Sequence, residues 1–226
     1  MENDGSELQE ELDLLAAAVR TTEKNFNDFN NRHFNGLKEE IVIHCIKRSG
    51  DLGNGCLIAA KTKLPQSLYI LTRGLFETLI HINWVIVSDE NAKTFADLTL
   101  NEVKRTGRNS MNRGFAHITN RETGEDVTKE AIDLYFSDLS RRPTLENMAK
   151  AAGLERLYVV FYGFLSIQSH GYTFSLSLPF ETVDDELMLA VASAKSLVQA
   201  INLVAETWIV RRKKTSTNDI YDILVM

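Results

Sequence analysis

One stretch of this chain, residues 64–87, is apolar nearly all round, yet it carries Arg73, Glu77 and His81 at intervals of four residues. Such intervals place side chains on one face of an α-helix. A helix that is apolar on its remaining faces is buried either in a protein core or in a membrane. Because Arg and acidic side chains cost about 2.5–3.5 kcal/mol each at the centre of a bilayer, we expect the core helix of a soluble protein.

The rest of the chain favours an all-α fold. Only 12 Gly and 3 Pro among 226 residues supply few of the turns that a many-stranded sheet needs. The hydrophobic share of 44% and the charged share of 25% are those of a globular protein, which excludes disordered and collagen-like classes. We therefore predict a single all-helical domain over residues 1–226, built as a bundle of about seven helices.

Four parts of this domain are expected. A long helix or helix pair covers residues 1–49, a core bundle residues 56–170, a long helix residues 184–214 and a tail residues 215–226. The boundary between the first part and the core bundle rests on residues 49–55, whose Gly, Asn and Asp residues are typical of a turn. The helices over residues 66–87 and 154–170 are strongly apolar, so we expect both to be central and to pack together.

Charge and cysteine content bear on partners and compartment. A net charge of −6 gives the surface as a whole no attraction for nucleic acid or for an anionic membrane. Cys45 and Cys56 are too few for a disulfide framework, so we expect reduced, buried thiols. The first residues lack the basic and apolar regions of a signal peptide. These features predict a cytoplasmic protein with no membrane partner.

A second polar stripe follows the later apolar helix. Its side chains recur every four residues: Tyr158, Tyr162, Ser166 and His170. If the two stripes meet, they form a water-poor site whose candidate catalytic residues are His170, Arg73, Glu77, Ser166 and Tyr162. In that site Arg73 would bind phosphate, Glu77 would orient Arg73, and His170 would act as acid and base. The alternative is a buried polar network that only fixes helix register, with His170 capping a helix end.

Basic residues gather in one segment of this acidic chain. They are the candidate substrate-binding residues: Lys104, Arg105, Arg108 and Arg113. Such a segment can follow a phosphate backbone, and the alternative is a solvated face that pairs with acidic neighbours.

Two repeated pairs are candidate metal ligands, Glu40 with His44 and Glu77 with His81. Each pair is spaced so that both side chains share a helix face. Di-iron bundles use Glu and His three residues apart with two further glutamates, and this chain lacks that spacing. His44 lies in an apolar run and is expected in the core. We predict no metal and no cofactor.

Two motifs carry a family resemblance. The run from Leu71 to Glu77, followed by the run from Tyr162 to His170, resembles a bacterial all-helical family of unknown function with an R-x-x-x-E core helix and a late S-x-x-x-H helix. More distantly the chain resembles HEPN proteins, many of which are metal-independent ribonucleases of toxin and phage-defence systems with an R-x4-H helix. Here Arg108 is followed at the histidine position by Arg113, and the next histidine is His117.

Two functions follow as expectations. The resemblance implies a HEPN-like helical effector that acts on RNA or a nucleotide in a toxin or phage-defence setting, as a metal-independent ribonuclease or a nucleotide-processing enzyme. The alternative is a non-catalytic helical sensor or protein-interaction module, in which the polar residues only specify packing. A homodimer is a candidate assembly in either case.

Overall fold

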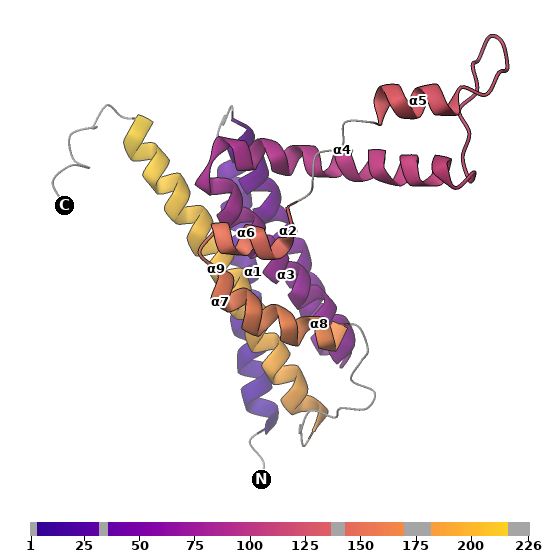
Figure 1. The fold of residues 1–226 in the computed structure, drawn as a ribbon. Helices are drawn as coiled ribbons and strands as arrows, with labels where there is room; N and C mark the ends of the chain where they lie inside the picture. Colours follow the sequence, from indigo (N-terminus) through magenta and orange to yellow (C-terminus); the bar gives the residue numbers. More distant parts are fainter. Residues whose placement is uncertain (1–3, 32–35, 137–142, 170–181, 217–226) are drawn as a thin grey trace.

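The computed structural model describes residues 4–31, 36–136, 143–169 and 182–216. Within these ranges the chain forms about eight helical runs, and the only pairing of extended backbone is an isolated bridge between Thr119 and Asp126. The predicted all-α bundle is confirmed (Figure 1).

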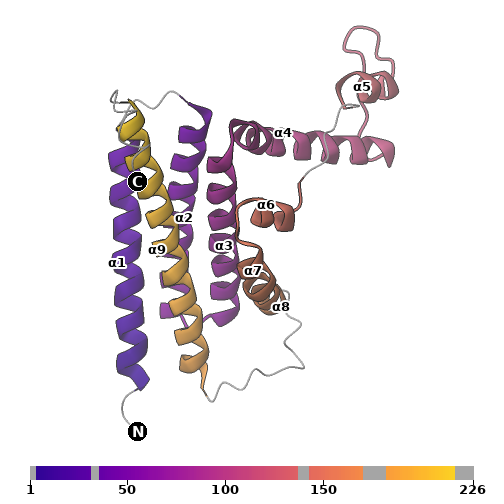
Figure 2. The same ribbon diagram turned by 60° about the vertical axis from the view of Figure 1, so that its left-hand side comes forward.

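The helices are bounded as follows: α1 (Asp4–Asn30), α2 (Leu37–Lys61), α3 (Pro65–Val87), α4 (Asp89–Asn112), α5 (Thr128–Tyr135), α6 (Leu145–Ala151) and α9 (Val183–Ser216). Between α6 and α9, one unbroken run joins α7 (Glu155–Leu157), the π-helix η1 (Tyr158–Tyr162) and α8 (Gly163–Ser169). The long helices α1, α2, α3 and α9 lie side by side, and α6, α7 and α8 cover the outer side of α3 (Figure 2).

Helix α3 is central, as predicted. It begins with Pro65 in its first turn, where the missing N–H costs no helical hydrogen bond. Leu75, Phe76 and Ile80 are fully buried between α2, α9 and the α7–η1–α8 run. The prediction of a core helix at residues 66–87 is thus correct.

The second central helix is α9 rather than residues 154–170. Leu187, Val191 and Ile201 of α9 are fully buried. In the α7–η1–α8 run, by contrast, Val159 is 65% and Val160 is 74% exposed. The run packs against α3 on one side only, so apolar residues on its other side face outward. The prediction that this helix packs against residues 66–87 is confirmed, and the prediction that it is central and buried is wrong.

The turn predicted at residues 49–55 is also wrong, because α2 continues through it to Lys61. Gly53 serves helix packing instead. A Cβ atom on Gly53 would lie 2.6 Å from Cγ2 of Val19 on α1, too close for two carbon atoms. Glycine at this position lets α1 and α2 approach closely, and this contact offsets the low helix propensity of glycine.

Helix α4 belongs half to the bundle and half to a projecting arm. Its first turn is capped by Ser88, whose Oγ accepts a hydrogen bond from the Asn91 backbone N–H at 3.0 Å. Phe95 and Leu98 pack against the core, whereas the second half extends away from it and carries α5 (Figures 1 and 2). We call residues 99–136 the arm.

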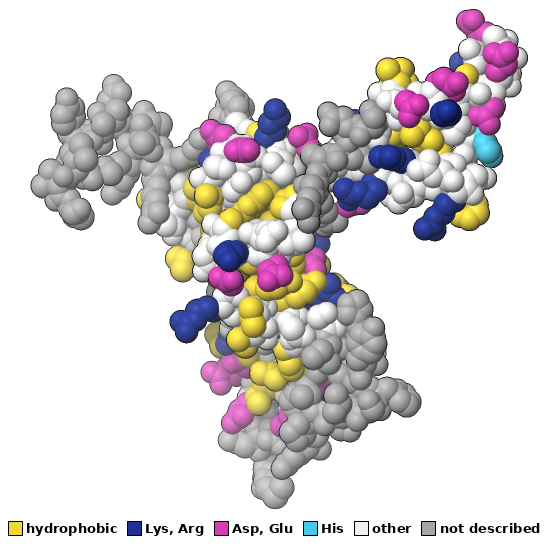
Figure 3. Space-filling view, in the orientation of Figure 1, with side chains coloured by type: hydrophobic (Ala, Val, Ile, Leu, Met, Phe, Trp, Pro, Cys, Tyr) yellow, Lys and Arg dark blue, Asp and Glu magenta, His cyan; other side chains and the backbone are white. Residues whose placement is uncertain are grey.

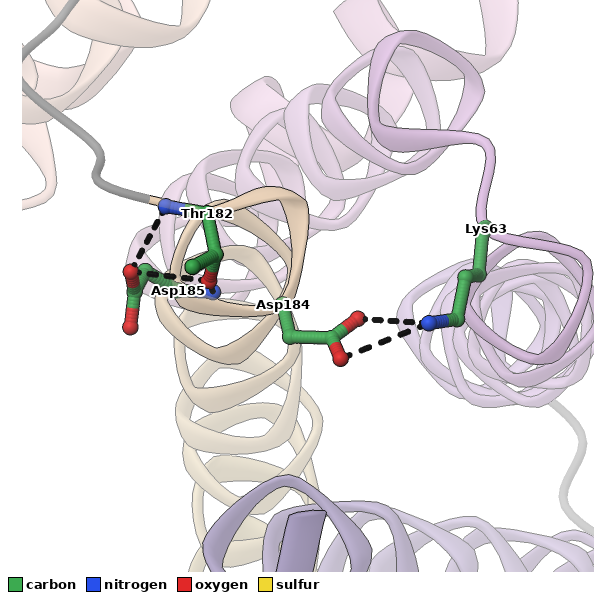
Figure 4. A network of polar contacts seen from close by, with 4 residues as sticks. All are labelled: Lys63, Thr182, Asp184 and Asp185. Carbon is green, nitrogen blue, oxygen red and sulfur yellow. Dashed lines mark hydrogen bonds and ion pairs between the residues drawn. The ribbon is translucent and has the colours of Figure 1, made fainter. Parts of the chain in front are cut away.

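The start of α9 is held by two polar contacts (Figure 4). Thr182 and Asp185 form a reciprocal capping box, in which each side chain accepts the other's backbone N–H, at 3.2 and 2.9 Å. Asp184 pairs with Lys63 at 2.9 Å. Lys63 lies between α2 and α3 with a φ of 54°, a left-handed backbone conformation that ends α2. The capping box fixes the first turn of α9, and the ion pair attaches that turn to the α2–α3 connection.

Two helices are long and apolar enough to cross a membrane by length and composition, α3 and residues 183–210 of α9. In the folded bundle, 50% of the α3 window and 44% of the α9 window are buried. A core helix of a soluble protein passes the same test, so this finding does not decide where the protein resides.

We predict that Gly53→Ala destabilises the protein by about 1–3 kcal/mol, because the new methyl group meets the stiff, buried side chain of Val19. The matched control is Gly163→Ala, at a helical position with no atom within 4 Å of the new Cβ. It should be neutral or stabilising by up to about 1 kcal/mol. Urea titration followed by circular dichroism measures both. Equal effects would contradict the close α1–α2 contact.

Candidate functional site

The polar stripe of α3 forms an ion pair at the surface of the core. Arg73 Nε donates to Glu77 Oε1 at 3.2 Å, one helical turn further on. The Arg73 side chain is 22% exposed and that of Glu77 is 28% exposed. The pair is therefore half-buried, so that its charges are only partly screened by water.

The second stripe reaches this pair through Tyr162. Nη2 of Arg73 donates to Tyr162 Oη at 2.6 Å, and the guanidinium carbon lies 4.9 Å from the centre of the Tyr162 ring. The two predicted stripes thus meet, at Arg73, Glu77 and Tyr162. This cluster is called the Arg73 site below.

A π-helix supplies Tyr162. The segment η1 has five residues, and such π-helical turns are rare and often occur at functional sites. Tyr158 stacks on Tyr162 with ring centres 4.8 Å apart and an interplanar angle of 15°. The ring of Phe76 lies beside those of Tyr162 and Phe161, with centres 6.4 and 5.3 Å apart. Aromatic rings therefore border the site.

Burial and neighbouring charges act on Tyr158. Burial raises its pKa above the usual value, Tyr162 and Glu146 raise it further, and Arg73 opposes them. Tyr158 was outside the predicted catalytic set, although it precedes Tyr162 by one turn in the same stripe. That spacing is the signal by which it could have been found.

The remaining predicted catalytic residues lie on and after α8. Ser166 is on α8, one turn beyond Tyr162, and is partly buried. Residue 170, the predicted acid and base His170, lies outside the described residues. The described part of the site therefore comprises a cation, a carboxylate and a phenol. Arg73 presents a planar fork of donors that suits phosphate or carboxylate, and Glu77 holds that fork in place.

The four predicted substrate-binding residues lie on the second half of α4 and at its end, in the arm. Arg105 pairs with Glu102 at 2.7 Å, and Arg113 is exposed just after the last turn. Lys104 and Arg108 are partly exposed and make no ion pair with another described residue. Lys and Arg side chains are visible along this projection, together with Asp and Glu side chains (Figure 3). The second half of α4 extends away from the bundle (Figures 1 and 2), so these residues do not join the Arg73 site.

The arm has a polar hollow of its own. A pocket of about 640 Å³ between α4 and α5 is lined by residues that include Arg108, His117, Asp126 and Lys129. His117 Nδ1 lies 3.3 Å from Asp126 Oδ2, and both side chains are more than half exposed. The hydrogen bonds of Thr128, together with nearby His117, lower the pKa of Asp126. Sequence spacing did not reveal this pair, because a loop brings it together.

The two residue pairs weighed as metal ligands lie apart from any larger set of donors. Among the described residues no three His, Cys, Asp or Glu side chains are grouped so as to hold a metal ion. His81 contacts the ring of Phe95, and Glu77 bonds to Arg73. His44, expected in the core, is exposed on α2, because the apolar run around it has an outward face.

We predict that Arg73→Ala and Glu77→Ala are not additive, because either change leaves a half-buried charge without its partner. A double-mutant cycle on the free energy of unfolding should give a coupling of about 0.5–1.5 kcal/mol. The control is the more exposed pair Glu102 and Arg105, for which we expect a coupling below about 0.5 kcal/mol. A coupling of zero for the first pair would show that it contributes nothing to folding.

Comparison with known proteins places these features in a family. A model of DUF5677, described as a family of unknown function, matches residues 39–187. No curated protein and no solved structure matches the chain. The match runs from the start of α2 into the first turns of α9, so it includes both the Arg73 site and the arm. The chain belongs to the DUF5677 family of unknown function.

Proposed function

We propose that this protein is a HEPN-like helical effector that acts on RNA or a nucleotide, in a toxin or phage-defence setting. The observation that carries the proposal is the contact between Arg73 and Tyr162 at 2.6 Å, which joins the two polar stripes at one half-buried place. A guanidinium held between a carboxylate and a phenol is suited to bind a phosphate group.

The proposed chemistry assigns one role to each residue. Arg73 binds the phosphate and stabilises the negative charge that develops on it. Glu77 orients Arg73 through the Nε contact. His170 accepts the proton of the attacking hydroxyl and returns it to the leaving oxygen. For RNA, the attacking group is the ribose 2′-hydroxyl and the bond that breaks joins phosphorus to the 5′-oxygen. Tyr162 and Ser166 position the phosphate by hydrogen bonds.

The basic side chains of the arm support a polymeric substrate. Lys104, Arg108 and Arg113 provide positive charge on an element that projects from the bundle, in a chain whose net charge is −6. A strand bound along the arm would contact these residues through its phosphates, whereas a free nucleotide needs only the Arg73 site.

The catalytic part of the proposal is tested on labelled RNA and on nucleotides in the presence of a chelator. Wild type should cleave its substrate, and folded His170→Ala should lose at least about 100-fold in rate. Arg73→Ala should lose activity and also stability, because it leaves the Glu77 carboxylate without its ion-pair partner Arg73. The control is His44→Ala, at an exposed histidine on α2, which should remain active. Equal rates for wild type and His170→Ala, or no activity in either, would refute the proposed enzymatic activity.

The role of the arm is tested by RNA affinity as a function of salt. Arg108→Gln and Arg113→Gln should each weaken binding and reduce the slope of log affinity against log salt by about 0.7–0.9. Lys93→Gln is the control, because Lys93 is exposed on the half of α4 that packs on the bundle. An equal effect of all three changes would mean that binding follows net charge and not the arm.

A second candidate function is a non-catalytic sensor or interaction module. The observation that favours it is the exposed apolar surface of the α7–η1 segment, where Val159 and Val160 face outward. Absence of activity on RNA, DNA and nucleotides, with a stable fold, would favour this reading.

A further inference from the structure

Helix α9 has an outward face without charge. Along 22 residues its exposed and half-exposed side chains recur at intervals of four and three: Leu189, Ser193, Ser196, Ala200, Leu203, Thr207 and Val210. Leu203 is 65% exposed and Val210 is 54% exposed. Alternating intervals of four and three give the heptad spacing by which one helix packs along another. We call this face the α9 stripe.

The charged side chains of α9 between residues 187 and 210 point elsewhere. Lys195 pairs with Glu11 of α1 at 2.6 Å. Glu206 accepts a hydrogen bond from Asn25 of α1, also at 2.6 Å. Both charges are thus used within the bundle, which leaves the α9 stripe apolar or weakly polar throughout.

A groove runs beside the α9 stripe. It has a volume of about 350 Å³ and is lined by Leu79 of α3, by Leu157 and Phe161, and by small residues of α9 that include Ser193 and Ser196. Figure 3 shows hydrophobic side chains gathered on this face of the bundle. Figure 1, in the same orientation, shows that α7 and α9 lie there. Small side chains on one wall and large ones on the other leave room for a side chain of leucine size.

We propose that the α9 stripe and this groove are the interface of a homodimer, in which α9 packs antiparallel to α9 of a second copy about a two-fold axis near Gln199. An axis there places Leu203 of each copy over Ser193 and Ser196 of the other, so that a large side chain enters the groove beside small ones. The surface is therefore complementary to itself, as an interface with two-fold symmetry requires.

The charges at the two ends of α9 favour the same arrangement. The first turn of α9 carries Asp184, Asp185 and Glu186, of which only Asp184 pairs with a described basic side chain, that of Lys63, and the sequence of its last turns contains the basic run of residues 211–214. Antiparallel packing places the acidic first turn of each copy beside the basic last turn of its partner. The helix dipoles then also run in opposite directions, which adds to the attraction. A parallel arrangement would bring like charges together at both ends.

The proposal is tested by light scattering after gel filtration of the full chain over a range of concentrations. Wild type should have twice the 25.5 kDa of one chain. Leu203→Glu should weaken the dimer by at least about 100-fold, because each copy would bring a charge into an apolar groove. The matched control is Val103→Glu on the arm, at a side chain with the same exposure of 65%, which should remain dimeric.

Two further measurements decide the arrangement. Ser196→Glu changes an exposed residue of the same stripe and should also give monomers, so the test does not depend on one variant folding. Ala200→Cys, on the stripe and one residue from the proposed axis, should form a disulfide-linked dimer on mild oxidation, and Val103→Cys should not. The native thiols do not interfere, because Cys45 and Cys56 are buried and burial raises both pKa values to about 12.

Several outcomes would overturn the proposal. A wild-type protein that is monomeric at every concentration would overturn it. If that monomer binds lipid vesicles, the α9 stripe is assigned to a membrane surface instead. A dimer that Leu203→Glu and Ser196→Glu leave intact would place the interface elsewhere. These results are independent of the RNA and nucleotide assays, so either proposal can fail alone.

Discussion

The burial of α3 is the constraint on which the rest of the structure depends. Helices α2 and α9 cover it on the side of the bundle, and the α7–η1–α8 run covers it on the other. A buried helix has room for charges only where its cover is incomplete. Arg73 and Glu77 lie at such a place, where Tyr162 of η1 contacts the guanidinium and about a quarter of each charged side chain remains exposed. The Arg73 site thus lies where the neighbouring helices cover α3 incompletely.

Sequence reasoning succeeded where a signal is local or periodic. The apolar span of α3 and the four-residue spacing that joins Arg73 to Glu77 can both be read from residues that are close together in the chain. It failed where the outcome depends on a distant partner. Gly53 by itself is typical of a turn, yet it lies inside α2, where Val19 of α1 approaches it closely.

The α7–η1–α8 run shows a second kind of limit. Its apolar content suggested burial, but content does not tell how many sides of a helix are covered. Val160 and Leu165 are equally apolar in character, yet the first is exposed and the second buried. The π-helical turn likewise has no pattern in the sequence that distinguishes it from a regular helix, although it sets the direction from which Tyr162 reaches Arg73.

The corner between α3 and α4 has a mechanical consequence. Ser88 caps α4, and Asn91 Nδ2 donates to the Trp84 carbonyl at 2.9 Å, so two contacts brace the junction across one residue of non-helical backbone. Because α4 is one uninterrupted helix of 24 residues whose first half packs on the bundle, the arm acts as a stiff lever that leaves the bundle after Leu98. A sideways load at the far end of the arm is therefore delivered as torque to the packed half of α4 and, through the braced corner, to the end of α3, the helix that carries Arg73.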